Sequence, residues 1–119
     1  MNKRSFGSLG ETEAVKYLEN KGFKVLVRNY HYGENEIDII ARDGDTITFI
    51  EVKKRTTNAY GSAAEAVTPS KQRAIIKTAL NYLKANHLLN SKIRFDVITI
   101  QNDNIKYIPC AFDATGYMR

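Results

Sequence analysis

The stretch that decides the fold is Glu36–Lys53, which reads EIDIIARDGDTITFIEVK. Its two aliphatic runs, Glu36–Ala41 and Thr46–Lys53, predict two β-strands because they are rich in β-branched and aromatic residues. The pair Asp43-Gly44 between them predicts a tight turn. The stretch therefore predicts an antiparallel hairpin.

Charged side chains lie among aliphatic neighbours in both predicted strands. Asp38 is flanked by isoleucines, while Glu51 and Lys53 are two residues apart and point to one face of the sheet. If the two strands pair, these three side chains can converge. Buried charges are costly unless they are compensated, solvated or bound to an ion, so the convergence requires an explanation.

Two interpretations of these charges remain open. Two carboxylates beside a lysine suit a Mg²⁺-dependent phosphodiesterase, because Mg²⁺ prefers one or two carboxylates plus waters and phosphate oxygens. The lysine could orient or deprotonate the attacking water, or stabilise the developing phosphorane charge. The alternative is a solvent-facing strand with a simple ion pair, and spacing alone slightly favours it because Glu-x-Lys is common by chance.

The rest of the chain predicts an α/β fold with the order α-β-β-β-α-β-β. Helices packed on a mixed five-stranded sheet are the expected architecture. Ser8 and Glu11 predict a capping box, Gly22 a helix stop, and Thr68-Pro69 the start of a second helix. The remaining expected elements are a helix over Ser8–Lys21, a strand over Phe23–Val27, a mobile loop over residues 54–66, a helix over Pro69–His87, and strands over Ile93–Ile100 and Ile105–Ile108 joined by a turn at Asn102–Asn104.

Composition limits the class of protein. The chain has 119 residues, 43% hydrophobic and 26% charged, which predicts one domain over residues 1–119 and excludes a disordered chain. No apolar run approaches the ~20 residues that span a bilayer, and no secretory signal is recognised, so a cytoplasmic protein without membrane contact is expected. One cysteine excludes an internal disulfide and a cysteine-rich zinc site. The net charge of +5 favours polyanionic partners, although it also fits a basic solubility surface.

The spacing of the acids resembles a known nuclease pattern. Asp38, twelve intervening residues and then Glu51-Val52-Lys53 resemble the core of the PD-(D/E)XK nuclease superfamily. The whole chain resembles the YraN family of small bacterial proteins, which is similar to the archaeal Holliday junction resolvases. The residues that carry this resemblance include Gly10-Glu11, Gly22-Phe23, Arg28-Asn29, Glu36–Ile40, Phe49–Arg55, Lys71, Arg73, Arg94–Val97 and Ala111-Phe112.

The resemblance implies a restriction-endonuclease-like fold and a metal-dependent activity. It implies that Asp38, Glu51 and Lys53 occupy the metal and catalytic positions, with Mg²⁺ or Mn²⁺ as cofactor and Glu11 completing the metal site. The implied reaction is hydrolysis of structured or branched DNA, and a two-fold homodimer would supply two equivalent sites for symmetric cutting. A module that binds nucleic acid without cutting it, and a partner-binding scaffold, are the alternatives.

Basic and aromatic residues near the predicted site are candidates for DNA contacts. Lys54, Arg55, Lys71 and Arg73 could hold phosphates on either side of the scissile bond, and Tyr60 could stack on an exposed base. For Lys71 and Arg73, an ordinary solvated helix face is an equal alternative.

Four other residues receive structural interpretations. Glu36 is expected to be a solvated charge at a strand edge, and a role as a metal ligand or as an acceptor behind the ligands is the alternative. Glu11 has helix capping as an alternative to metal binding. Asp96 is expected to pair with Arg94 or Arg28. Cys110 is expected to be a small buried hydrophobe.

Overall fold

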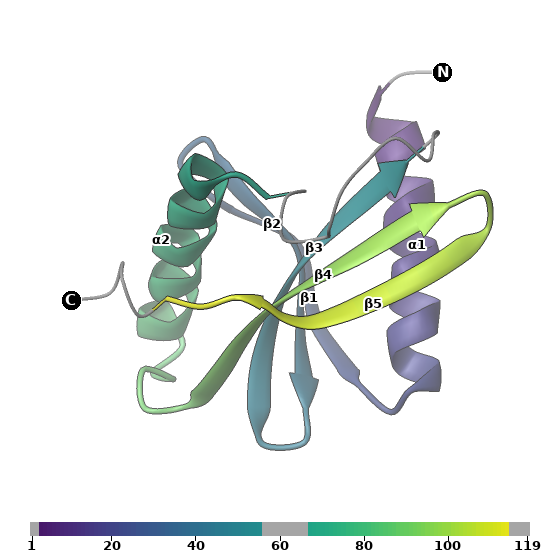
Figure 1. Cartoon of the computed structure of the whole chain (residues 1–119). Helices are drawn as coiled ribbons and strands as arrows, with labels where there is room; N and C mark the ends of the chain where they lie inside the picture. The colour runs from purple at the N-terminus through teal and green to yellow at the C-terminus, as the bar shows by residue number, and fades with distance from the viewer. Residues whose placement is uncertain (1–2, 56–66, 115–119) are drawn as a thin grey trace.

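The structure is a computed structural model that describes residues 3–55 and 67–114. A five-stranded sheet with the order β1-β2-β3-β4-β5 is covered by α1 on one face and α2 on the other (Figure 1). The elements are α1 (Lys3–Asn20), β1 (Lys24–Tyr32), β2 (Asn35–Asp43), β3 (Thr46–Arg55), α2 (Pro69–Ala85), β4 (Lys92–Gln101) and β5 (Asn104–Phe112). The predicted order of elements and the mixed sheet are confirmed.

The strands follow the chain order across the sheet. Strands β1, β2 and β3 pair antiparallel, β3 and β4 pair parallel, and β4 and β5 pair antiparallel. The parallel pair follows from the connection through α2, since parallel strands need a long crossover rather than a tight hairpin. The hairpin from β4 to β5 turns at Asn102 and Asp103, whose φ values of 48° and 70° suit a type I′ turn.

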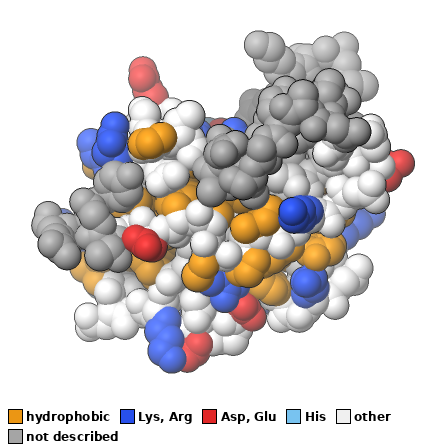
Figure 2. All heavy atoms as spheres, in the orientation of Figure 1, with side chains coloured by type: hydrophobic (Ala, Val, Ile, Leu, Met, Phe, Trp, Pro, Cys, Tyr) orange, Lys and Arg blue, Asp and Glu red, His pale blue; other side chains and the backbone are white. Residues whose placement is uncertain are grey.

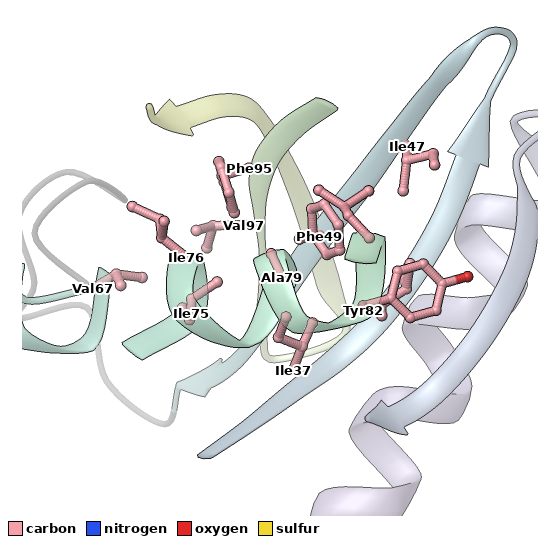
Figure 3. Packing of buried hydrophobic residues seen from close by; sticks show 12 residues of the cluster. Ile37, Ile47, Phe49, Val67, Ile75, Ile76, Ala79, Tyr82, Phe95 and Val97 are labelled. Atoms are coloured by element: carbon pink, nitrogen blue, oxygen red, sulfur yellow. The ribbon is translucent and has the colours of Figure 1, made fainter. Parts of the chain in front are cut away.

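Two hydrophobic clusters hold the helices on the sheet. The first lies between α2 and the sheet, where Ile76, Ala79 and Tyr82 face Phe49 and Val97 (Figure 3). The second lies between α1 and the opposite face, where Ala14 and Leu18 pack on side chains that include Ile39, Ile50 and Ile98. Successive residues of β3 and β4 thus face opposite clusters, because side chains alternate between the two faces of a strand.

The helix ends show which boundary predictions hold. Gly22 has a φ of 93°, and the Phe23 N–H donates to the Leu18 carbonyl at 3.0 Å, so α1 ends in a Schellman motif as the glycine predicts. Thr68 caps α2 by accepting from the Lys71 N–H at 3.2 Å. The predicted capping box at Ser8 is wrong because α1 already begins at Lys3, which places Ser8 and Glu11 inside the helix. No helix in the described ranges is long and apolar enough to cross a bilayer.

Strand boundaries differ from the prediction in two places. Strand β3 continues through Arg55, so the first two residues of the predicted loop belong to the sheet, and residues 56–66 lie outside the described residues. Strand β1 extends to Tyr32 because its polar residues lie on an edge strand that is partly open to solvent.

A buried polar cluster anchors β4. Asp96 is fully buried and accepts from the Arg94 Nε at 3.0 Å, from the Cys110 N–H at 2.9 Å and from the Tyr107 hydroxyl. Arg94, one of its two predicted partners, also donates to Asp43 at 2.9 Å. The cluster therefore ties β4 to β5 and to the end of β2.

Cys110 is exposed, so the prediction of a buried cysteine is wrong. The physical reason is a bulge, since the pairs Phe95↔Phe112 and Val97↔Ile108 leave three residues of β5 opposite Asp96. Cys110 lies in this bulge with a φ of 51°, and its N–H is directed to the Asp96 carboxylate.

We expect Asp96→Asn to lower the free energy of unfolding by at least about 2 kcal/mol, because it weakens three hydrogen bonds to a buried carboxylate and leaves Arg94 less compensated. Urea denaturation at pH 7 measures this change. The matched control is Asp45→Asn, whose exposed pair with Lys92 should leave stability nearly unchanged. Equal midpoints for the two variants would contradict a structural role for the cluster.

Candidate metal and catalytic site

The candidate site begins where β2 separates from β3. The register of the two strands runs from Asp43↔Thr46 to Ile39↔Ile50 and stops there, while β2 stays paired with β1 as far as Asn35. Asp38 is the next residue of β2. Its Oδ2 accepts from the Val52 N–H at 2.8 Å, so a carboxylate takes the place of a backbone acceptor at this point.

The alternation of side chains also changes at Asp38. Ile37 belongs to the α2 cluster and Ile39 to the α1 cluster, although residues two apart normally share a face. Opposite Asp38 in β1 lies Asn29, which has a φ of 55° between the pairs Arg28↔Ile39 and Tyr30↔Ile37. Asparagine tolerates this left-handed conformation better than most residues. The two strands therefore switch faces together, and Asp38 lies at the switch.

Asp38 and Glu51 lie close enough to share a proton. A side-chain hydrogen bond joins the two carboxyl groups, and it raises the pKa of Glu51 while lowering that of Asp38. Glu51 is only 8% exposed, and burial together with the Asp38 charge raises its pKa to about 8. Burial also raises the pKa of Asp38, although the Val52 N–H opposes this shift. With a pKa of about 8, Glu51 keeps its proton at neutral pH and can donate it to Asp38.

Two lysines act on these carboxyl groups, Lys53 on Glu51 and Lys71 on both acids. The Lys53 Nζ lies 3.8 Å from the Glu51 Oε1. Lys71, in the first turn of α2, lowers the pKa of both Asp38 and Glu51 by its charge. These two cations do not outweigh burial, since the pKa of both acids remains raised. The site therefore retains an affinity for further positive charge.

A second group of acids reaches Asp38 from α1 and from the start of β2. One carboxylate oxygen each from Glu11, Glu36 and Asp38 lies within 4.8 Å of the other two. Glu11 is 9% exposed, and its pKa is raised by burial and by the charges of Asp38 and Glu36. A hydrogen bond from the Asn29 side chain opposes this shift, and Arg28 lies 4.0 Å from Glu11.

The structure brings some of the predicted site residues together and leaves others apart. Asp38, Glu51, Lys53 and Lys71 are brought together, and Glu11 joins them through Asp38. Glu51 is not a member of the three-carboxylate group found among the described residues, but it hydrogen-bonds to Asp38.

The predicted DNA contacts are only partly near this site. Lys54 is exposed on the opposite face from Lys53, where its Cδ would lie 3.8 Å from a Cβ at Gly10. Arg73 is exposed on α2. Only the backbone of Arg55 is described, and Tyr60 lies outside the described residues.

Glu36 lies where its alternative role as a ligand would place it. Its carboxylate is partly exposed and lies beside those of Glu11 and Asp38. The sequence signal for this proximity is the spacing of two residues between Glu36 and Asp38, which can place both side chains on one face of a strand. The sequence could not show that α1 brings a third acid to the same place.

The fold and the acids define an α/β protein in which a cluster of carboxyl groups lies where two strands of a mixed sheet, β2 and β3, separate. A family model described as "Uncharacterised protein family UPF0102" matches residues 10–100. A UPF0102 protein of Geobacter metallireducens is 48% identical over 117 residues, covering 95% of this chain and 96% of that protein. One of Chlorobium limicola is 50% identical over 123 residues, covering 94% and 95%. The chain belongs to the UPF0102 family, which is the YraN family that its sequence resembles.

The raised pKa of Glu51 predicts how stability depends on pH without metal. The folded state holds a proton up to about pH 8 that the unfolded state releases near its ordinary pKa of 4.5, so the free energy of unfolding should fall as the pH rises between these values. Glu51→Gln should remove most of this fall, because the amide stays neutral and can still donate to Asp38. We expect the variant to gain at least about 2 kcal/mol relative to wild type between pH 5 and pH 9.

Urea denaturation in EDTA at several pH values measures this difference. The exposed Glu34→Gln variant is the control and should follow the wild-type profile. Parallel profiles for wild type and Glu51→Gln would show that Glu51 ionises normally.

Proposed function

We propose that the protein is a metal-dependent endonuclease that hydrolyses phosphodiester bonds in structured or branched DNA. The observation that carries this proposal is the hydrogen bond between the buried Glu51 and the half-buried Asp38. Lys53 lies beside Glu51, and the carboxylates of Glu11 and Glu36 lie next to Asp38. A purely structural ion pair needs one acid and one base, whereas this site holds more acids than its nearby lysines neutralise.

The donor set fits a hard divalent cation. All candidate ligands are carboxylate oxygens, and Mg²⁺ and Mn²⁺ prefer oxygen ligands. Asp38, with Glu11, Glu36 and Glu51, would hold the ion, which would replace the shared proton as the compensating charge. When bound, such an ion polarises a phosphoryl group and makes water more acidic.

The remaining chemistry belongs to side chains of this chain. In hydrolysis, a water oxygen bonds to phosphorus, the bond from phosphorus to one ester oxygen breaks, and a proton ends on that leaving oxygen. Lys53 lies on the same face as Glu51, so it can orient the attacking water and stabilise the added negative charge. Lys71 can hold a neighbouring phosphate, because its charge already acts on both acids.

Cleavage of DNA tests the proposal. Linear, flapped and four-way DNA are incubated with Mg²⁺ or Mn²⁺, and we expect wild type to cut at least one of the structured substrates and EDTA to stop the reaction. Asp38→Asn, Glu51→Gln and Lys53→Met should each lose on the order of 100-fold or more in rate, because each lacks a group that acts on the reacting phosphate. Asp45→Asn, which removes an exposed acid, should cut like wild type.

Two results would overturn the endonuclease proposal. One is the absence of cutting by wild type on every substrate with both metals. The other is equal cutting by wild type and Glu51→Gln, which would indicate a contaminant. Salt-sensitive DNA binding without any cutting would favour the non-catalytic binding module, and absence of binding would favour the scaffold.

Thermal unfolding tests metal binding independently of cleavage. Mn²⁺ at ten times its dissociation constant should stabilise wild type by about 1.4 kcal/mol, or roughly 6 °C. The shift should be larger at pH 8 than at pH 6, because protons compete with the metal for the acids. Asp38→Asn should lose most of the shift while Asp45→Asn keeps it; equal shifts in all three proteins would contradict a metal site at Asp38.

A further inference from the structure

A row of polar side chains crosses three strands next to the candidate site. The register pairs Lys53 of β3 with Thr99 of β4, and Thr99 with Lys106 of β5. Directly paired residues of neighbouring strands point to the same face. Lys53, Thr99 and Lys106 therefore form one row, which we name the β-row.

The β-row lies on the face that carries Glu51. The neighbours of its members, which include Val52, Ile98 and Tyr107, pack in the cluster under α1. Because side chains alternate along a strand, the β-row points to the other face. Val97 and Phe49, which share that face, belong to the cluster under α2. The row is thus continuous with the acids through Lys53, whose Nζ lies 3.8 Å from Glu51.

The outer end of the β-row is exposed and basic. Lys106 is exposed and Thr99 is half-buried. Within residues 3–55 and 67–114, no acidic side chain forms an ion pair with Lys106. Figure 2 shows basic side chains beside hydrophobic ones in the region where β4 and β5 run.

The spacing of the β-row fits a nucleic acid strand. Neighbouring strands lie about 4.8 Å apart, so the row is about 10 Å long from Lys53 to Lys106. This length corresponds to roughly three nucleotide steps at about 3.4 Å of axial rise each. The two ammonium groups and the hydroxyl between them can contact phosphate oxygens. They do not form a pattern of donors and acceptors that would distinguish one base from another.

We propose that the β-row is a subsite for the DNA backbone, in which Thr99 and Lys106 hold the phosphates to one side of the phosphate that Lys53 contacts. This inference rests on the proposed function, because it takes the acid pair as the position of the scissile phosphate. It adds Thr99 and Lys106 to the residues proposed to contact DNA. It also implies that the DNA strand runs from the acid pair across β4 and β5.

Equilibrium binding of labelled four-way and linear DNA in EDTA tests the subsite without cleavage. We expect Lys106→Ala to raise the dissociation constant three- to tenfold at 0.1 M salt. It should also lower the slope of log K against log salt concentration by about 1, because one phosphate contact is lost. Thr99→Val, which removes only the hydroxyl, should raise the dissociation constant about twofold with an unchanged slope.

Lys84→Ala is the matched control, because it removes the same charge from an exposed position near the end of α2. Its dissociation constant and slope should stay within error of wild type. The subsite is overturned if Lys106→Ala and Lys84→Ala behave alike, or if wild type binds none of these DNAs. Thermal unfolding confirms that each variant is folded at the temperature of the measurement.

The result separates this inference from the endonuclease proposal. If Lys106→Ala weakens binding as expected while wild type never cuts DNA, the subsite stands and the nuclease assignment fails. If wild type cuts DNA and Lys106→Ala binds it as wild type does, the nuclease assignment stands and the subsite fails.

Discussion

The candidate site depends on a coordinated break in the side-chain alternation of β1 and β2. Asn29 in β1 adopts a φ of 55°, and at the same level β2 passes from Ile37 under α2 to Ile39 under α1. A regular strand would have placed Asp38 on one face only. At the break, its carboxylate instead accepts from the Val52 N–H and replaces a ladder contact between β2 and β3. The irregular backbone has an energetic cost, which the hydrogen bonds of the two strands and the packing of both helices must offset.

This position makes Asp38 accessible from both faces of the sheet. Glu11 approaches it from α1, and Glu51 approaches it from the face that α2 covers. The charges of Asp38 and Glu36 raise the pKa of Glu11, because burial limits solvation of the added charge. The charge of Asp38 raises the pKa of Glu51 for the same reason. Lys53, Lys71 and Arg28 reduce this repulsion without removing it, since the pKa values of Glu11, Asp38 and Glu51 stay above their ordinary range. The arrangement is unfavourable for three or four free carboxylates and favourable for carboxylates around a cation or a proton.

Sequence reasoning predicted the fold well because its signals are local. The alternating run at Glu36–Lys53, Gly22 after α1 and Thr68-Pro69 before α2 each determine a conformation through nearby residues. The failures at Ser8 and Cys110 have a different origin. Ser8 carries a capping signal inside a helix that continues upstream, and Cys110 lies in a bulge that forms opposite buried Asp96. The meeting of Glu36 with Glu11, which arises through the packing of α1 on the sheet, has the same origin. These features depend on contacts between distant residues, which a local pattern does not contain.

The strands and the helices contribute different residues to the candidate site, and this difference follows from the same geometry. Asp38, Glu51 and Lys53 are carried by β2 and β3, whose positions are fixed by hydrogen bonds and by two hydrophobic clusters. Glu11 and Lys71 are carried by helices that contact the sheet through side chains, so their distances from Asp38 can adjust more easily. In the proposed endonuclease this difference is useful, because the strand-borne groups can keep the reacting geometry while helix-borne groups adapt to the charge that is bound. Glu11 and Lys71 should therefore adjust the affinity for the ion and the phosphate. The strand residues Asp38, Glu51 and Lys53 should determine whether hydrolysis occurs.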